Sequence, residues 1–288
     1  MRAIYKHEMA SFFTSWVGYV FIAILLLFAG IFMSAVCLTT GNTHFEYVLG
    51  NMTFVYIVAV PVITMRVFSG ERRQRTDQLL FSLPVSSTKI VLGKYLALIT
   101  LLAIPMAVIL FYPPVLMLYG IINILPAYAS IVAFYFLGAA LLAVGMFISS
   151  LTESQVLSVG ITLAVLLLNF FLASLANYAG TAPFVSFVGF LVAAAAVTLV
   201  VFLMTKHWLV TLITGVVLFG VVISTYVYNS TMYTNLLSKF LEGCSLFYRF
   251  DSFMYGTFRF EHILCYVSVA GIFVFLTVQS LEKRRWSA

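Results

Sequence analysis

The chain has 288 residues, of which 63% are hydrophobic and only 8% are charged, and its formal net charge is +6. A soluble domain of this length carries far more charge, so the composition predicts an all-α, polytopic helical membrane protein. The positive charge does not indicate nucleic-acid binding, because the basic residues stand beside apolar segments, where membrane orientation requires them.

Residues 1–16 predict a short amphipathic helix at the cytoplasmic membrane surface. The aromatic and methionine side chains of this segment fall on one helical face, and its charged residues, Glu8 among them, lie off that face. The alternative is a plain N-terminal extension of the first membrane span.

Long apolar runs predict about eight membrane-spanning helices, which together make residues 1–288 a single transmembrane domain. The predicted spans are 17–38, 51–65, 95–119, 127–150, 156–176, 184–204, 209–228 and 263–279. A six-span plan, in which the pair between residues 184 and 228 does not cross, is the alternative. None of these spans contains Asp, Glu, Lys, Arg or His in its interior, whereas ion-coupled carriers usually need such a group.

The distribution of charge predicts the orientation. Residues 66–94 form the longest polar interval and hold six of the fifteen Lys and Arg residues. Positive charge resists translocation, so this interval is predicted to be a cytoplasmic loop. With both termini inside, twelve Lys and Arg residues lie on the inner side and three on the outer side. This split favours a bacterial cytoplasmic (inner) membrane protein with both termini in the cytoplasm.

Within the basic loop the sequence predicts a short helix, Asp77–Leu83. Thr76 can cap its start, and Pro84 prevents its continuation. Three apolar side chains would be exposed to water on it: Leu79, Leu80 and Phe81. Exposed apolar side chains on a short helix indicate a partner protein that covers them.

Three short runs in this loop carry a family resemblance. They are ERRQRTDQLL at residues 71–80, LPVS at 83–86 and VLGKY at 91–95. Together they resemble the first cytoplasmic loop of type-2 ABC-transporter permeases, most closely the gliding-motility-associated GldF-like branch. Residues 245–251, before the last span, and 280–286, after it, agree with this resemblance.

The resemblance implies the membrane-spanning permease subunit of an ATP-driven ABC exporter, with the translocation path formed as a dimer with a second copy or a related permease. The short helix would then be the coupling helix, which docks on a separate ATPase subunit. The implied docking residues are Glu71, Thr76, Asp77, Leu79, Leu80, Phe81, Leu83, Pro84 and, in the turn 151–155, Glu153. For Glu153 a mere helix-capping turn is the alternative.

Nucleotide chemistry is expected only in the partner. The chain contains no G-x-x-x-x-G-K-[ST] phosphate loop, so it is not predicted to be an enzyme. The resemblance places ATP and Mg²⁺ in the separate ATPase and implies no cofactor in this chain.

A few further residues are predicted to act in packing. Gly138 and Gly145 form a small-residue stripe that lets another helix approach closely, and Asn169 is expected to make an interhelical hydrogen bond. The three cysteines have no metal-ligand spacing, and no metal site is predicted. The cysteines are expected either to be free thiols or to form a disulfide such as Cys37–Cys244.

Residues 229–260 are too charged to span and predict short amphipathic helices at the extracytoplasmic membrane surface, where membrane lipid surrounds them. Two other function classes stay open. One is an ion-coupled secondary transporter or channel. The other is a mechanotransmitting ABC complex that acts on an extracytoplasmic partner protein without translocating cargo. The sequence does not indicate the cargo.

Overall fold

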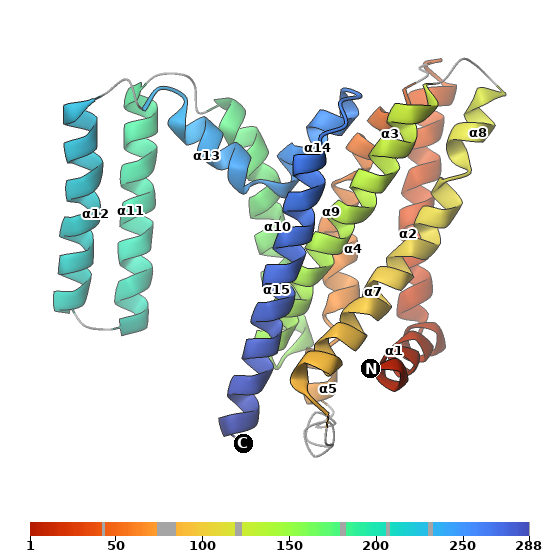
Figure 1. The fold of residues 1–288 in the computed structure, drawn as a ribbon, viewed down its shortest axis with the longest axis horizontal. Helices are drawn as coiled ribbons and strands as arrows, with labels where there is room; N and C mark the ends of the chain where they lie inside the picture. The colour runs from red at the N-terminus through yellow and green to blue at the C-terminus, as the bar shows by residue number, and fades with distance from the viewer. Residues whose placement is uncertain are drawn as a thin grey trace. The chain divides into compact units, whose positions relative to one another are not determined.

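The computed structural model describes residues 1–41, 44–73, 85–118, 123–178, 183–205, 208–229 and 233–287, and all regular elements in these ranges are helical (Figure 1). The prediction of an all-α polytopic protein is therefore confirmed. The chain divides into two compact units, residues 1–168 with 246–288 and residues 169–245.

The helices of the larger unit are α1 (Arg2–Thr14), α2 (Trp16–Phe32), the π-helix η1 (Met33–Leu38), α3 (Phe45–Met52), α4 (Val55–Thr64), α5 (Ser69–Arg73), α7 (Ser87–Ile109), α8 (Tyr112–Met117), α9 (Ile124–Leu151), α14 (Leu246–Met254) and α15 (Phe260–Ser287). Helix α10 (Gln155–Tyr178) continues from the larger unit into the second one. The second unit also contains α11 (Pro183–Thr205), α12 (Trp208–Tyr228) and α13 (Leu236–Cys244).

Five helical segments of the described chain are long and apolar enough to cross a membrane: Trp16–Leu38, Ser87–Met117, Ile124–Leu151, Gln155–Ala176 and Phe260–Arg285. The segments 45–52 and 55–72, bent by 53° at their junction, give a sixth if they form one span. Helices α11 and α12 occupy the positions of the two additional predicted spans. That this pair crosses the membrane stays a prediction.

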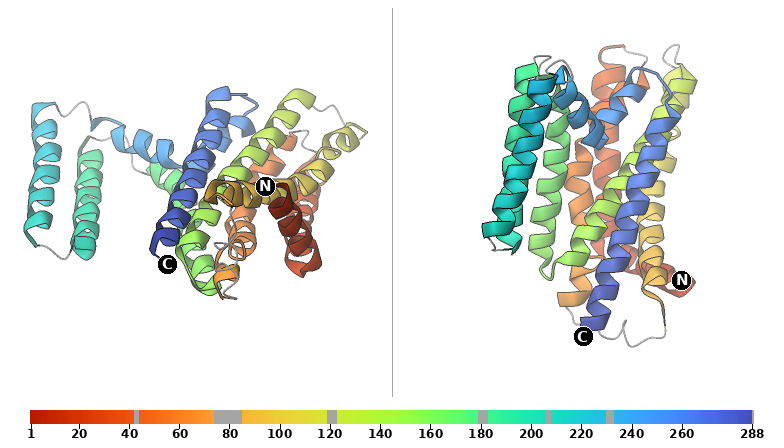
Figure 2. Two further views of the ribbon diagram at one scale, coloured as in Figure 1. Left: turned by 60° about the horizontal axis from the view of Figure 1, so that its bottom comes forward. Right: turned by 60° about the vertical axis from the view of Figure 1, so that its left-hand side comes forward.

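Helix α9 lies at the centre of the larger unit, where it packs against α4, α7 and α15 (Figures 1 and 2). Its most apolar stretch is 78% buried, as expected for a helix that is hydrophobic on all sides. Two glycines allow α4 to approach α9. A Cβ added at Gly138 would stand 2.7 Å from the Tyr56 hydroxyl oxygen, and one at Gly145 would stand 2.6 Å from Thr64 Oγ1.

The first helix is separate from the first span. Helix α1 ends at Thr14, and Ser15 adopts an extended backbone, so α2 begins as a new helix in a different direction (Figure 1). The alternative of a plain extension is therefore wrong. Glu8 also differs from expectation, because it is only 8% exposed and lies against the protein.

In the second unit, Asn169 joins α10 to the end of α13. Its side-chain amide donates to the carbonyl oxygen of Cys244 at 3.0 Å, and Ser245 Oγ donates back to the carbonyl oxygen of Asn169 at 3.0 Å. The cysteines Cys37, Cys244 and Cys265 are all free thiols. The amphipathic helices predicted in residues 229–260 are present as α13 and α14.

Candidate functional site

Both chain termini lie at one end of the larger unit, which we term the terminal end (Figures 1 and 2). The described parts of the basic loop, residues 66–73 and 85–94, also lie there. The short helix predicted between them is outside the described residues. The structure therefore does not place these docking candidates: Thr76, Asp77, Leu79, Leu80, Phe81, Leu83 and Pro84.

A buried lysine stands at the base of this loop. Lys94 is 1% exposed, and its ammonium donates to Glu8 Oε1 at 2.5 Å, to Glu71 Oε1 at 2.6 Å and to the carbonyl oxygen of Val67 at 2.9 Å. The ring of Phe68 lies beneath it, with its centroid 5.1 Å from Nζ. The three acceptors satisfy all three N–H groups of the ammonium.

This arrangement corrects one expectation from the sequence. The third span was expected to begin at Tyr95 and to hold no Asp, Glu, Lys, Arg or His. Helix α7 instead begins at Ser87, so Lys94 lies two turns inside it and inside a candidate membrane span. A charge in such a place is costly unless it is paired, and the two carboxylates supply that pairing.

The Lys94 cluster, Glu8, Glu71 and Lys94, joins three elements that are far apart in the sequence. Glu8 comes from α1, Glu71 from α5 and Lys94 from α7. Further contacts fasten α1 along α7. The Tyr5 hydroxyl donates to Thr100 Oγ1 at 3.2 Å, and a Cβ added at Gly93 would lie 3.1 Å from the side chain of Ile4.

The start of the loop is also bound to the end of α9. Ser149 Oγ accepts hydrogen bonds from the backbone N–H groups of Phe68 at 3.3 Å and Ser69 at 3.2 Å. Arg72 donates to the carbonyl oxygen of Thr152 at 2.9 Å and also to that of Ser150. A cation at a helix C-terminus satisfies carbonyls that have no partner within the helix and complements the helix dipole.

The turn after α9 is also in contact with α15. Arg284 donates to the carbonyl oxygen of Leu151 at 3.1 Å, and its guanidinium lies 3.9 Å from the carboxylate of Glu153. The Glu153 side chain is 84% exposed. Arg285 reaches the other stem of the loop, donating to the carbonyl oxygen of Val85 at 3.4 Å. These hydrogen bonds therefore attach both stems of the loop to the helix bundle at the terminal end.

The two docking candidates that the structure describes have different surroundings. Glu71 has its carboxylate on Lys94 and its side chain is 23% exposed, whereas Glu153 stands on the surface. Contact of either residue with an ATPase stays a prediction. In the described chain no group of three or more His, Cys, Asp or Glu residues is arranged to hold a metal ion.

Sequence reasoning missed Lys94, Glu8, Arg72 and Ser149 as a connected set. Lys94 could have been noticed as a lone cation followed by an unbroken apolar run, since a charge at the edge of a span needs a partner. Its partner Glu8 is 86 residues away, and no pattern in one sequence links the two.

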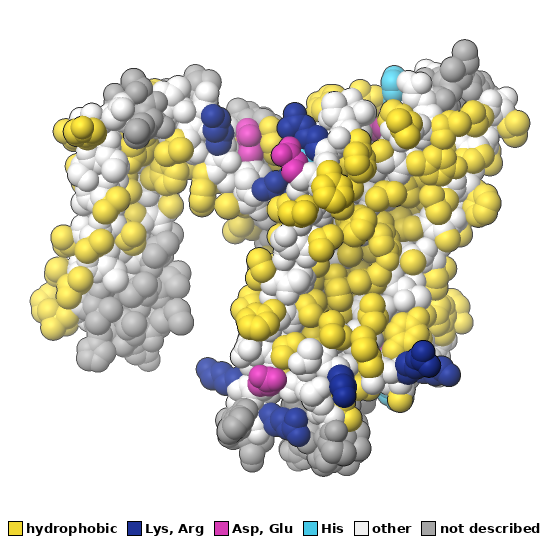
Figure 3. All heavy atoms as spheres, in the orientation of Figure 1, with side chains coloured by type: hydrophobic (Ala, Val, Ile, Leu, Met, Phe, Trp, Pro, Cys, Tyr) yellow, Lys and Arg dark blue, Asp and Glu magenta, His cyan; other side chains and the backbone are white. Residues whose placement is uncertain are grey.

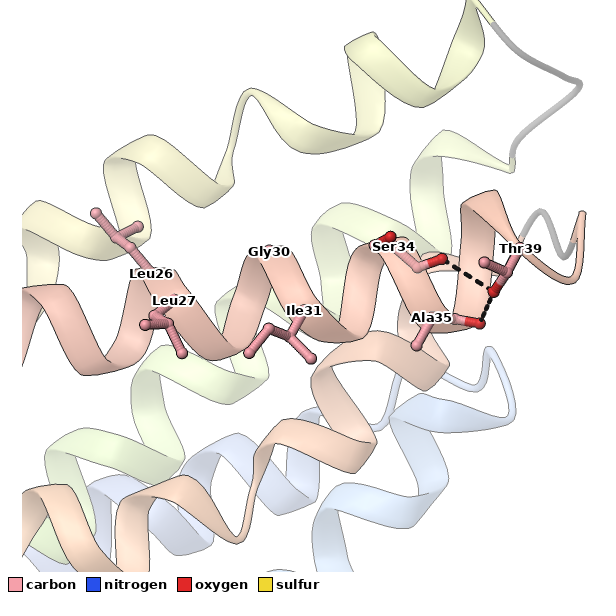
Figure 4. Close-up of a pocket in the computed structure, with 7 residues that line it drawn as sticks. All are labelled: Leu26, Leu27, Gly30, Ile31, Ser34, Ala35 and Thr39. Atoms are coloured by element: carbon pink, nitrogen blue, oxygen red, sulfur yellow. Dashed lines mark hydrogen bonds between the residues drawn. The ribbon is translucent and has the colours of Figure 1, made fainter.

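A separate hollow of about 680 Å³ lies on the outer surface of α2 and η1, at the other end of the unit (Figure 4). Gly30, Ser34 and Ala35, which have small side chains or none, are among its lining residues. Thr39 Oγ1 donates to the carbonyl oxygens of Ser34 at 3.1 Å and Ala35 at 2.5 Å, which satisfies backbone groups of the π-helix. The lining residues of this hollow include no titratable side chain.

The family model described as ABC-2 family transporter protein matches residues 2–188, which include α1, the basic loop, α9 and α10. No curated protein and no solved structure matches the chain. The family match covers more than half of the chain and contains every element that meets at Lys94. The chain is a multi-pass membrane protein that belongs to the ABC-2 family of transporter proteins.

Proposed function

We propose that this chain is the permease subunit of an ATP-driven ABC exporter, docked on a separate ATPase through residues 66–94 and paired with a second copy or a related permease. One observation carries the proposal: both stems of that loop are bound to the bundle, through the Lys94 cluster, Arg72 and Arg285. A force applied to the loop would therefore move α1, α7 and the end of α9 rather than bend the stems alone.

In this proposal the ATPase binds ATP and Mg²⁺, and the chain itself is not an enzyme. The apolar contact with the ATPase is made by Leu79, Leu80 and Phe81. A second, polar contact with the ATPase is made by Glu153, in the turn after α9. Glu71 contributes by holding the first stem against Lys94. When the ATPases close on ATP, the loop is displaced, and α1 and α7 follow because the cluster joins them.

The proposal extends to orientation and branch. The twelve-to-three division of basic residues supports a terminal end that faces the cytoplasm of a bacterium. The runs at residues 71–80, 83–86 and 91–95 support the GldF-like branch. An extracytoplasmic partner, the feature of a mechanotransmitting complex, would act on the opposite side.

A specific observation also favours a second candidate function. Lys94 is a cation within a candidate span and is paired with two carboxylates, and such groups serve ion-coupled carriers as proton or ion sites. The exporter proposal gives them a structural role instead, because their hydrogen bonds satisfy one another.

The test is purification of the tagged chain from native membranes, followed by reconstitution into vesicles. We expect a protein with a nucleotide-binding phosphate loop to co-purify, to be identified by mass spectrometry, and to hydrolyse ATP faster with the chain than without it. Hydrolysis should persist when ionophores collapse the pH and sodium gradients. A chain that purifies alone and dissipates a pH or sodium gradient would establish the ion-coupled function instead.

A further inference from the structure

A second hollow in the larger unit lies between three candidate spans, α7, α9 and α15, and has a volume of about 420 Å³. Its lining consists only of aliphatic, aromatic and glycine residues. Those used below are Leu92 and Tyr95 of α7, Tyr135 and Ala139 of α9, and Gly271 and Val274 of α15. We refer to it as the α7–α15 groove.

The groove presents hydrocarbon at two of the three tyrosines that line it. The Tyr95 hydroxyl donates to the carbonyl oxygen of Ala139 at 3.0 Å, and the hydroxyl of Tyr266, another lining residue, donates to the carbonyl oxygen of Leu246 at 3.1 Å. With these hydroxyls engaged by the protein, the rings face the groove. Apart from the hydroxyl of Tyr135, the lining is apolar and suits a hydrocarbon chain.

The groove opens towards the lipid. Gly271 is exposed, and a Cβ added there would meet no atom within 4 Å. Figure 3 shows apolar side chains covering this face of the larger unit between two charged edges: Lys and Arg side chains gather along its lower edge at the terminal end, and Lys and Arg lie together with Asp and Glu near its upper edge. The groove therefore lies at the depth of lipid tails, and a row of cations lies at the depth of headgroups.

Two exposed cations lie towards the terminal end of the groove. Lys89 precedes Leu92 by three residues, less than one turn of α7. Arg285 follows Val274 by eleven residues, about three turns, and so lies on the same face of α15. The bond from Arg285 to Val85 brings this end of α15 to the start of α7. Glu282 is the one acidic residue in the last two turns of α15.

We propose that the α7–α15 groove binds one anionic phospholipid from the leaflet at the terminal end. One acyl chain fills the groove, and the phosphate lies against Lys89 and Arg285. The occupant is a lipid rather than a second copy of the chain because an apolar groove with cations at one end matches the tail and headgroup of a single amphiphile. This site is independent of the exporter proposal and requires only that the chain spans the membrane.

The test is native mass spectrometry of the full chain in detergent with an equimolar mixture of phosphatidylglycerol and phosphatidylethanolamine of identical acyl chains. Gly271→Phe fills the groove, and Gly160→Phe is its control, because Gly160 lies on α10 and also has no atom within 4 Å of an added Cβ. Lys89→Gln removes a headgroup cation. Arg259→Gln is the control for it, since Arg259 is 59% exposed at the opposite end of the unit.

We expect wild-type chain to retain phosphatidylglycerol about 25-fold over phosphatidylethanolamine, because each of the two basic side chains near the anionic lipid contributes about five-fold. Lys89→Gln should lower bound phosphatidylglycerol about five-fold, Gly271→Phe should lower it at least as much, and both controls should keep the wild-type amount. Lys89→Gln keeps the test decisive if Gly271→Phe fails to fold, because Lys89 is exposed.

Three outcomes would overturn the proposal. The first is equal retention of the two lipids by the wild-type chain. The second is an undiminished phosphatidylglycerol adduct on both Lys89→Gln and folded Gly271→Phe. The third is a dimer that Gly271→Phe dissociates, which would assign the groove to a second copy of the chain.

Discussion

Lys94→Met removes the cation from the Lys94 cluster while keeping a long unbranched side chain. Glu8 and Glu71, whose Oε1 atoms lie 2.5 and 2.6 Å from Nζ, would then share a site without their common partner. Loss of one member of a buried ion pair costs about 3–5 kcal/mol. We expect about 4 kcal/mol, within that range, because the Glu71 side chain is 23% exposed and water can reach part of it.

Two matched variants separate charge from packing. Glu8→Gln leaves the Lys94–Glu71 pair and an acceptor oxygen in place, so it should cost only about 1 kcal/mol. The triple variant Lys94→Met, Glu8→Gln, Glu71→Gln leaves no unpaired charge, so it should be more stable than Lys94→Met alone. Equilibrium unfolding in mixed detergent micelles, followed by circular dichroism, measures all three. A Lys94→Met chain within about 0.5 kcal/mol of wild type would refute this reasoning.

Three further predictions concern other parts of the larger unit. Gly145→Ala places a Cβ 2.6 Å from Thr64 Oγ1 and should lower the free energy of unfolding by about 1–3 kcal/mol, whereas Gly160→Ala should not destabilise the chain. Arg72→Gln removes donors from the last carbonyls of α9 and should accelerate amide hydrogen exchange in residues 66–73; unchanged exchange would contradict this role. Burial raises the pKa of Asp251 on α14 to about 6, so the stability this group contributes is present below its unfolded pKa of about 4 and is lost as the pH rises through 6. Asp251→Asn should therefore raise the melting temperature at pH 8 but not at pH 4, and an equal shift at both would count against it.

Features that depend on local pattern could be predicted from the sequence. Apolar runs gave the spans now occupied by α2, α9, α10 and α15, because only a helix satisfies its own backbone in lipid. The amphipathic repeats predicted the short helices that the structure shows as α13 and α14. The predicted small-residue stripe included the two glycines at which α4 packs against α9.

The cluster at the terminal end could not be predicted in this way. Glu8 was assigned to the side of α1 away from its apolar face, and Lys94 to the end of a loop, because hydropathy treats each charge as exposed. Pairing between them depends on where α1 turns after Ser15, which is a tertiary property. Arg72 had a sufficient explanation as a topology anchor, and only the structure shows it bound to the carbonyls of α9.

The central claim, that residues 66–94 transmit the action of an ATPase, is tested most directly on the apolar residues of the loop. Changing Leu79 and Leu80 together to Asp should leave the chain folded in the membrane, because those side chains are predicted to face water and a partner rather than lipid. The ATPase should be lost, since a buried interface anchor contributes about 2 kcal/mol or more.

The control changes Arg73 and Arg75 together to Gln, which removes charge from the same loop and spares Arg72, whose bonds to α9 are structural. The measurement is the amount of ATPase that co-purifies with each variant, normalised to the amount of chain in the membrane. The account predicts that the leucine variant loses its ATPase and the arginine variant keeps most of it. A leucine variant that retains the ATPase fully, beside an arginine variant that loses it, would contradict the account.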